Sequence, residues 1–244
     1  MLHDVTDRRV SVLVPTRGRP DSLFRSVESL LTLAARTDLV EVLCALDDDD
    51  PRLGEVLERL AHLGKLWPET TFVWKILERR GYSRLNEYFN ELAADALGEW
   101  LLLWNDDAFV ETESWDDVIC AEPATRVVCD LLSQLSPHLC CFPAVRRWAV
   151  EAVGGFSPHT PHCDTYWQDL GRAVPNAIDF VQVRVRHERA DITGQHNDQT
   201  YREGAGGGGY RTHDFYGARV QAQIAADVLK VSLALVERTR RTRP

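Results

Sequence analysis

Residues 98–110 form an apolar run that ends abruptly at two adjacent carboxylates. The apolar part, 100–104, is typical of a buried parallel strand, because an uninterrupted apolar run suits a strand covered on both faces. Asn105, Asp106 and Asp107 follow where this strand ends, and ligands of open α/β sheets bind at the carboxyl ends of the strands. Adjacent acids repel each other unless a cation or hydrogen-bond donors compensate them. The segment therefore predicts either a Mg²⁺ or Mn²⁺ site or a solvated turn that caps the next helix.

The chain before this strand alternates between strand-like runs and amphipathic helical spacing. We expect the first helix to be capped by Asp21 or Ser22, and a later helix to begin at Ser83 and stop at Gly98. The alternation predicts a doubly wound, mostly parallel sheet over about the first 110 residues. Its strands are expected at 10–14, 41–46, 71–77 and 100–104.

The second half of the chain is less regular. We expect one domain, 1–244, with a sheet-forming part, a second part, a glycine-rich loop and a C-terminal helix, at 10–110, 111–190, 191–213 and 214–240. The glycine run 206–209 within the loop is either a mobile lid or a plain linker. Within the second part we expect strands at 138–142 and 178–186 and helices at 146–153 and 164–174.

Composition narrows the class of protein. The chain has 244 residues, 44% of them hydrophobic, and a formal net charge of −9, which argues against a protein that coats nucleic acid. Its six cysteines show no zinc-type spacing and are interpreted as reduced, which predicts a cytoplasmic protein, or a host-cytoplasmic one if the source is viral. No apolar run approaches the ~18 residues that cross a membrane, and no signal peptide is recognised.

Three strand ends carry polar residues suited to a nucleotide diphosphate. These are Thr16 and Arg17 after the first strand, the acidic run 47–50 after the second and residues 105–107 after the fourth. Parallel topology brings all three to one edge of the sheet. The first strand is not followed by a GxGxxG fingerprint, and the sequence has no P-loop, which argues against a dehydrogenase or a kinase.

Taken together, segments 12–20 (VLVPTRGRP), 47–50 (DDDD) and 98–107 (GEWLLLWNDD) resemble the nucleotide-sugar-binding half of a GT-A glycosyltransferase of the family-2 type. Segments 154–156 (GGF) and 164–172 are similar to the acceptor-side motif of that family. The resemblance covers about residues 10–190. It implies a GT-A (Rossmann-like) α/β fold, with a mostly parallel central sheet flanked by helices, a smaller acceptor-side second half and a C-terminal helix.

The resemblance also assigns roles by position. Arg84 matches a basic residue near the nucleotide, Asp106 a ribose contact and Asp107 a ligand of Mn²⁺ or Mg²⁺. The chain departs from the family pattern at Asn105, where many members have Asp. The matches to the nucleobase contacts are Pro15, Arg17 and Asp48, with Asp47 able to exchange roles with Asp48 because the run has four aspartates.

The acceptor hydroxyl needs a general base on the opposite side of the anomeric carbon from the leaving phosphate. We expect Asp164 in this role, with Asp169 as the second choice and helix capping as the alternative for each. Related GT-A enzymes often use a histidine from the second half as a further metal ligand. His187 and His196 are the candidates, while His162 is a candidate acceptor contact and Trp167 the tryptophan expected against a sugar ring.

The sequence thus predicts a metal-dependent glycosyltransferase of the hexosyltransferase type. It would move a sugar from a nucleotide diphosphate, with UDP expected, to an acceptor hydroxyl, with inversion as the family-2 expectation. A nucleotidyltransferase and a non-catalytic nucleotide-sugar or glycan-binding module remain open. The acceptor is open among a small molecule, a protein side chain and a modified base in phage DNA, and the arginine-rich residues 238–243 permit DNA. The oligomeric state is open as well.

Overall fold

The computed structural model describes residues 9–189, 193–194, 202, 214–215 and 217–241. Eight strands form a sheet in the order β3-β2-β1-β4-β7-β6-β8-β5. The strands are β1 Val10–Thr16, β2 Val40–Asp47, β3 Thr71–Leu77, β4 Trp100–Leu103, β5 Ala108–Val110, β6 Val128–Leu132, β7 Pro143–Arg146 and β8 Ile178–His187. The helices are α1 Pro20–Leu33, α2 Leu53–Leu66, α3 Leu85–Asp95, α4 Trp115–Cys120, α5 Arg147–Val153, α6 Cys163–Ala173 and α9 Ala218–Arg241, with 3-10 turns η1 Thr37–Leu39 and η2 Tyr82–Arg84.

The first four strands are parallel to one another, as the alternation of strands and helices predicts. β1 lies between β2 and β4, with Val10 paired to Val40 on one side and to Trp100 on the other. Side chains on both faces of β1 are buried. Parallel pairing brings the carboxyl ends of β1, β2 and β4 to the same edge of the sheet, where the predicted polar residues follow.

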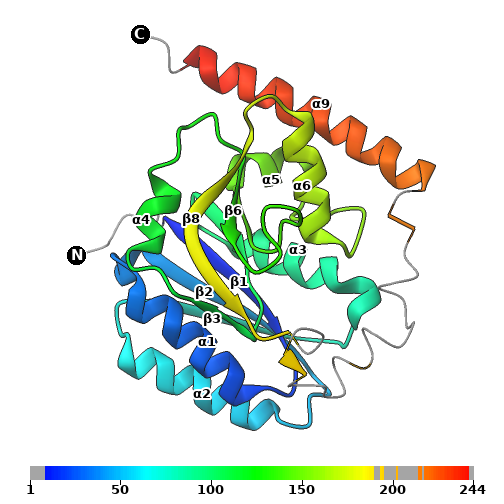
Figure 1. Ribbon diagram of the computed structural model, residues 1–244. Coiled ribbons are helices and arrows are strands. Elements are labelled where there is room, and N and C mark those ends of the chain that lie inside the picture. The colour runs from blue at the N-terminus through cyan, green and yellow to red at the C-terminus, as the bar shows by residue number, and fades with distance from the viewer. Residues whose placement is uncertain (1–8, 190–192, 195–201, 203–213, 216, 242–244) are drawn as a thin grey trace.

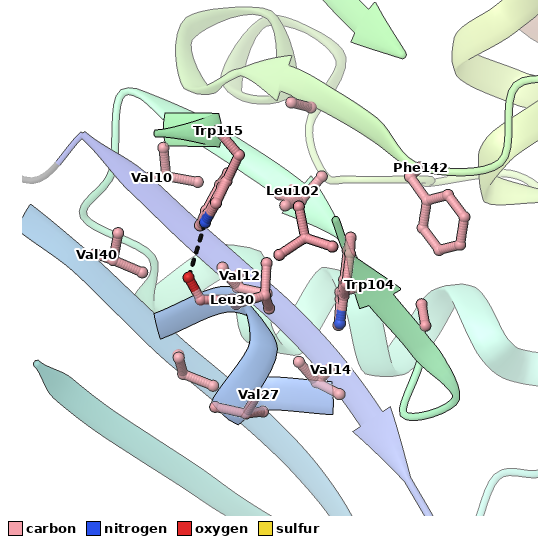
Figure 2. Close-up of a cluster of buried hydrophobic side chains, with 14 of the residues drawn as sticks. Val10, Val12, Val14, Val27, Leu30, Val40, Leu102, Trp104, Trp115 and Phe142 are labelled. Atoms are coloured by element: carbon pink, nitrogen blue, oxygen red, sulfur yellow. Dashed lines mark hydrogen bonds between the residues drawn. The ribbon is translucent and has the colours of Figure 1, made fainter. Parts of the chain in front are cut away.

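Helices cover both faces of the sheet, which confirms the expected α/β fold class (Figure 1). One face packs against α1, α2 and α4, with Val12 and Val14 of β1 in its core. Trp115 of α4 is fully buried in this cluster and donates its indole N–H to the carbonyl of Leu30, at 2.8 Å (Figure 2). The opposite face packs against α3, α5, α6 and α9, with Leu13 in its core. A strand whose alternate residues enter different cores needs apolar side chains on both faces, which explains the continuous apolar runs.

The second half of the sheet mixes strand directions. β7 runs antiparallel to β4 and to β6, β8 runs parallel to β6, and β5 pairs antiparallel with the end of β8. This last pairing sets His187 opposite Ala108. The end of β8 therefore lies beside the acidic pair that follows β4.

The predicted strand at 138–142 is wrong, because this segment is a loop and the strand is β7, which begins at Pro143. The fully buried carboxylate of Asp130 accepts hydrogen bonds from the backbone N–H groups of Cys141, at 3.1 Å, and Phe142, at 2.9 Å. These bonds satisfy donors that a strand would give to a neighbouring strand. The apolar run in this segment is consistent with burial but does not form a strand.

Two helix boundaries also differ from the prediction. α1 begins at Pro20 with Arg19 as its N-cap and no side-chain capping bond, so neither Asp21 nor Ser22 caps it. Gly98 does not end α3, whose C-cap is Ala96. A Cβ atom at Gly98 would lie 2.5 Å from the hydroxyl of Ser11, so the glycine is required by the close approach of this loop to β1.

The C-terminal helix α9 packs against α5 and α6 on the outside of the molecule (Figure 1). Most of the glycine-rich loop, including 206–209, lies outside the described residues, as does His196. In the described part of the chain, no helix is long and apolar enough to cross a membrane.

Candidate active site

The acidic pair lies in the turn between β4 and β5, and its two side chains have different partners. Asp106 accepts a hydrogen bond from the hydroxyl of Thr16 at 2.6 Å and contacts the guanidinium of Arg19 at 3.1 Å. Its backbone carbonyl accepts a hydrogen bond from Ser22 at 2.8 Å. Asp107 contacts His187. The turn thus directs one carboxylate toward β1 and α1 and the other toward the end of β8.

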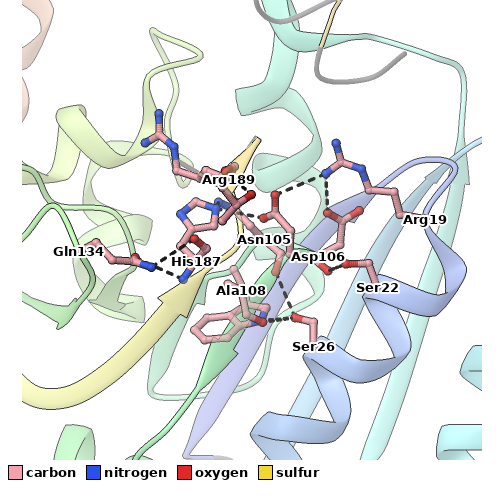
Figure 3. A network of polar contacts seen from close by, with 12 residues as sticks. Arg19, Ser22, Ser26, Asn105, Asp106, Ala108, Gln134, His187 and Arg189 are labelled. Atoms are coloured by element: carbon pink, nitrogen blue, oxygen red, sulfur yellow. Dashed lines mark hydrogen bonds and ion pairs between the residues drawn. The ribbon is translucent and has the colours of Figure 1, made fainter. Parts of the chain in front are cut away.

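Asp107 and His187 form a buried pair. The Nε2 atom of His187 lies 3.0 Å from Oδ1 of Asp107 and 3.1 Å from the amide nitrogen of Asn105. The backbone N–H of Glu188 donates to the carbonyl of Asp107 at 2.8 Å. Gln134 exchanges two hydrogen bonds, each of 3.3 Å, with the backbone of His187 (Figure 3). The position of the imidazole therefore depends on elements from both halves of the chain.

Burial and neighbouring charges together shift the pKa values of the two carboxyl groups in opposite directions. Burial raises the pKa of Asp106 to about 6, against the lowering effect of Arg19 and with a further increase from the charge of Asp107. Burial also acts to raise the pKa of Asp107, but the hydrogen bond and charge of His187, together with Arg19, lower it below its ordinary value. Asp107 is therefore the more strongly ionised member of the pair at neutral pH.

Arg19 is the buried cation of this site. Its guanidinium lies 3.1 Å from Asp106 and 3.6 Å from Asp107, and all three side chains are buried. The residue immediately precedes α1, so the start of that helix fixes its backbone. An internal cation lets two adjacent carboxylates remain buried together without a third compensating group.

The acidic run after β2 forms a second part of the site. Arg17 contacts Asp47 at 3.1 Å and also pairs with Asp49. Asp47 accepts a hydrogen bond from the Tyr88 hydroxyl. Burial raises the pKa of Asp47, while Tyr88 and Arg17 oppose the increase. The side chain of Asp48 is exposed, so Asp47 is held within the loop while Asp48 faces solvent.

The candidate bases lie on α6. Asp164 is in the first turn of α6, half-buried, and accepts hydrogen bonds from the backbone N–H of Thr165 at 2.7 Å and from its hydroxyl at 3.2 Å. Burial raises the pKa of Asp164, and the charge of His162 opposes the increase. Burial, with the charge of Asp164 among lesser contributors, raises the pKa of Cys141 to about 11. The charge of Asp164 therefore acts on the loop at Cys141. The residue after Cys141 is Phe142, whose ring packs edge-on against the ring of His187 with 5.0 Å between ring centres.

The remaining predicted residues have contacts of their own. Arg84 is exposed and pairs with Glu87 at 2.6 Å. Asp169 is half-buried, and burial raises its pKa against the effect of Arg172. Pro15 is half-buried within β1, where it is paired with Ala45 of β2.

The sugar-stacking role expected of Trp167 is wrong. Its side chain is fully buried, and its indole N–H donates to the carbonyl of Phe156 at 2.6 Å. It also packs edge-on against the rings of Phe156 and Tyr166. Trp167 is therefore a core residue of α6.

His162 directs its ring toward Phe215, with ring centres 5.6 Å apart.

Arg19 and Tyr88 are site residues that the sequence reasoning missed. Two buried acids at one strand end require compensation, and Arg19, next to Pro20, was available as a compensating cation. Tyr88 carries no comparable signal, because its helical spacing with Leu92 equally indicates a core residue.

The donor atoms of Asp107 and His187 fit a divalent cation. Two ligands of an octahedral Mg²⁺ at about 2.1 Å lie about 3 Å apart, which matches the 3.0 Å between Oδ1 and Nε2. Within the described ranges, no group of three or more His, Cys, Asp or Glu residues is placed to hold a metal. The protein would supply two ligands, leaving the other positions for substrate phosphates and water.

Comparison with known proteins gives an independent assignment. The family model for glycosyl transferase family 2 matches residues 11–121. The mannosyltransferase PcManGT of Pyrobaculum calidifontis, in complex with GDP-Man and Mn²⁺, superposes with a TM-score of 0.60 at 16% identity, over 99% of this chain and 78% of that one. S. aureus TarS superposes with a TM-score of 0.55 at 14% identity, over 72% of this chain and 36% of TarS, so the match spans about a third of that protein. TarS 1–349 in complex with UDP gives 0.54 at 14% identity, over 94% and 82%. No curated protein matches the sequence significantly.

The sheet and these matches give the chain a fold similar to that of GT-A glycosyltransferases. Its first half is similar to glycosyl transferase family 2.

Proposed function

We propose that the protein transfers a sugar from UDP to an acceptor hydroxyl, with inversion at the anomeric carbon and with Mn²⁺ or Mg²⁺ at Asp107 and His187. The observation that carries this proposal is the buried contact of these two side chains at 3.0 Å, beside a second carboxylate at the end of a parallel strand. A nucleotide diphosphate needs such a cation because its leaving group is an anion.

The complexes of the structural neighbours support this class of donor. One neighbour is bound to GDP-Man and Mn²⁺, and TarS 1–349 has been solved with UDP and with UDP-GlcNAc. The likeness supports nucleotide-sugar transfer and a divalent cation. UDP is proposed here from the acidic residue available after β2, because a carboxylate can accept the N–H of uracil.

For the nucleotide, we propose that Asp48 accepts the uracil N–H while Pro15 and Arg17 lie along the base. The exposed side chain of Asp48 supports this choice over Asp47, which Arg17 and Tyr88 already engage. We propose that Asp106 contacts the ribose. Its contacts with Thr16 and Arg19 direct it away from His187, which is consistent with separate roles for the two acids.

In the proposed reaction, the acceptor oxygen forms a bond to the anomeric carbon while the bond from that carbon to the β-phosphate oxygen breaks. Asp164 accepts the proton of the acceptor hydroxyl, and the raised pKa that burial gives this carboxyl improves it as a base. When bound, the cation stabilises the negative charge that develops on the diphosphate. Asp107 and His187 would hold it, and the two hydrogen bonds of Gln134 fix the backbone of His187.

The decisive experiment is calorimetric titration of UDP into the protein with Mn²⁺ and then with EDTA. Binding is expected with Mn²⁺ and is expected to be lost with EDTA or in the Asp107→Ala variant. Asp38→Ala is the matched control, because Asp38 pairs with Arg36 on the exposed surface. UDP binding that is independent of metal and of Asp107 would overturn the metal assignment, and failure to bind UDP while another nucleotide binds would overturn the choice of base.

Product analysis separates the alternatives. Turnover of a UDP-sugar that releases UDP identifies a glycosyltransferase, whereas release of pyrophosphate from UTP and a sugar phosphate would identify a nucleotidyltransferase. Binding of a UDP-sugar with no turnover across candidate hydroxyl acceptors, and without slow hydrolysis, would instead favour a binding module.

A further inference from the structure

The outer face of α9 carries an apolar stripe that faces solvent. Leu229, Leu233 and Val236 are 60%, 64% and 47% exposed. The opposite face of the same helix is buried against α5 and α6 and includes Ile224 and Val231. A helix that is apolar on two opposite faces is typical of one covered on both sides, and Figure 1 shows α9 at the outside of the molecule.

The exposed stripe has the spacing of a coiled-coil seam. Its members recur at intervals of four, three, four, three and four residues, which is the heptad spacing of a and d positions. They are Ala222, Ala226, Leu229, Leu233, Val236 and Arg240, and all six are exposed. An amphipathic surface helix that packs only on its own domain has no need of this second seam.

The stripe is complementary to itself in antiparallel orientation. When two copies of α9 pair about Val231, Leu229 of each copy meets Leu233 of the other, and Ala226 meets Val236. The long side chain of Arg240 then lies over Ala222. Two leucines thus meet in each central layer, and an alanine faces a larger side chain in each outer layer.

The charges beside the stripe select the same pairing. Lys230 and Glu237 lie on one flank, seven residues apart, at the e positions of successive heptads. In an antiparallel pair, e positions face e positions, so Lys230 of each copy, which is half-exposed and contacts Asp227 of its own helix at 2.7 Å, comes opposite Glu237 of the other. A parallel pair would set Ser232 opposite Glu237 and Ala225 opposite Lys230, which offers no charge pairing. We infer that α9 is the antiparallel interface of a homodimer of this chain.

This surface is separate from the candidate active site. α9 packs on α5 and α6, whereas the acidic pair lies in the β4–β5 turn at the carboxyl ends of the strands. The inference therefore does not depend on the proposed function, and it leaves the active site of each copy accessible.

Sedimentation velocity of the full chain across a range of concentrations tests the dimer. Leu233→Glu puts a carboxylate into both central layers and is expected to raise the dissociation constant roughly 100-fold. Leu66→Glu is the matched control, because Leu66 is 49% exposed at the end of α2 on the opposite face of the sheet. Both variants are expected to keep the wild-type circular dichroism spectrum, since both leucines face solvent in the monomer, and loss of the dimer is expected to lower the unfolding temperature of Leu233→Glu alone. A chain that stays monomeric at every concentration, or a dimer insensitive to Leu233→Glu, would overturn the inference.

Cysteine cross-linking tests the orientation. The double variant Ala226→Cys/Val236→Cys is expected to form a covalent dimer under mild oxidation, because residues 226 and 236 of opposite copies meet twice in the antiparallel pair. Ala226→Cys alone is expected to stay uncross-linked, whereas efficient cross-linking of that single variant would indicate a parallel pair. Wild type serves as the control, since five of its six native cysteines are buried and Cys120 is half-buried.

Charge reversal gives a smaller and more specific effect. Glu237→Lys sets like charges against Lys230 of the other copy and is expected to weaken the dimer roughly fivefold, while Glu237→Gln is expected to have a smaller effect. Co-sedimentation with phosphatidylserine vesicles tests the alternative occupant. The dimer would be overturned if the chain stays monomeric in solution and binds the vesicles, and if Leu233→Glu abolishes this binding. The stripe would then bind an anionic lipid surface.

Discussion

The two halves of the sheet position functional side chains in different ways. In the first half, Thr16, Asp47 and Asp106 follow or end parallel strands, so strand register alone brings them to one edge. In the second half, His187 reaches the same edge through an antiparallel pairing, and Asp164 comes from the start of a helix. A buried carboxylate, Asp130, holds the intervening loop against the ring of His187. Regular topology thus places the site residues of the first half, and individual polar contacts place those of the second half.

This contrast predicts that the largest loss comes from the residue that joins the two halves. Asp107→Asn keeps the shape of the side chain and removes the charge that contacts His187. We expect kcat/KM to fall about 10³-fold, because the variant loses electrostatic stabilisation of the leaving group. The Mn²⁺ titration measured by electron paramagnetic resonance should weaken in parallel. Equal activity in Asp107→Asn and in the surface control Asp38→Asn would remove Asp107 from the site.

The second half is expected to affect the chemical step without affecting donor binding. Asp164→Asn should lower kcat a few hundred-fold through loss of the general base, while calorimetric binding of UDP stays within twofold of wild type. Asp169→Asn, on the same helix, is the matched control and should lower kcat less than threefold. The reverse ranking of these two variants would transfer the base to Asp169.

Each half contains a buried acid whose ionisation opposes folding. Burial is the largest cause that raises the pKa of Asp106 and of Asp130 from 3.8 to about 6. Between about pH 4 and pH 6 the folded state therefore binds more protons than the unfolded state, so stability falls as pH rises.

Urea unfolding of Asp106→Asn and wild type at pH 4 and pH 7 measures this effect. The stability of the variant relative to wild type should rise from pH 4 to pH 7, because the asparagine does not ionise. Asp130→Asn should change in the same direction. Asp107→Asn should show no such gain, since the lowered pKa of Asp107 stabilises the fold above pH 4 and this contribution is lost only at lower pH. Parallel pH profiles for Asp106→Asn and wild type would contradict the argument.

The difference between the two halves of the sheet also explains which parts of the structure could be predicted from the sequence. The first four strands were predictable because their apolar runs are long and alternate with helical spacing, and the acids after β4 followed from where that run ends. The loop 138–142 was not predictable, because the carboxylate of Asp130 takes the place of a neighbouring strand as the hydrogen-bond acceptor. Asp130 lies eleven residues before Cys141, and such a contact leaves no periodic pattern in the sequence. The burial of Trp167 was equally invisible, since an aromatic residue in a helix is compatible with either face.

The smallest predicted effect distinguishes two arginines that the sequence treated alike. Arg17 lies beside the buried Asp47 at the nucleotide edge, whereas Arg84 is exposed and paired with Glu87. Arg17→Ala should raise the Kd for UDP about tenfold, because it removes a cation from a partly buried site. Arg84→Ala should change the Kd less than twofold, since an exposed i,i+3 pair contributes little and is screened by salt. Calorimetry on both variants with Mn²⁺ makes the comparison. A larger effect at Arg84 than at Arg17 would mean that η2 moves toward the nucleotide on binding. This edge of the sheet would then be less rigid than its strand pairing implies.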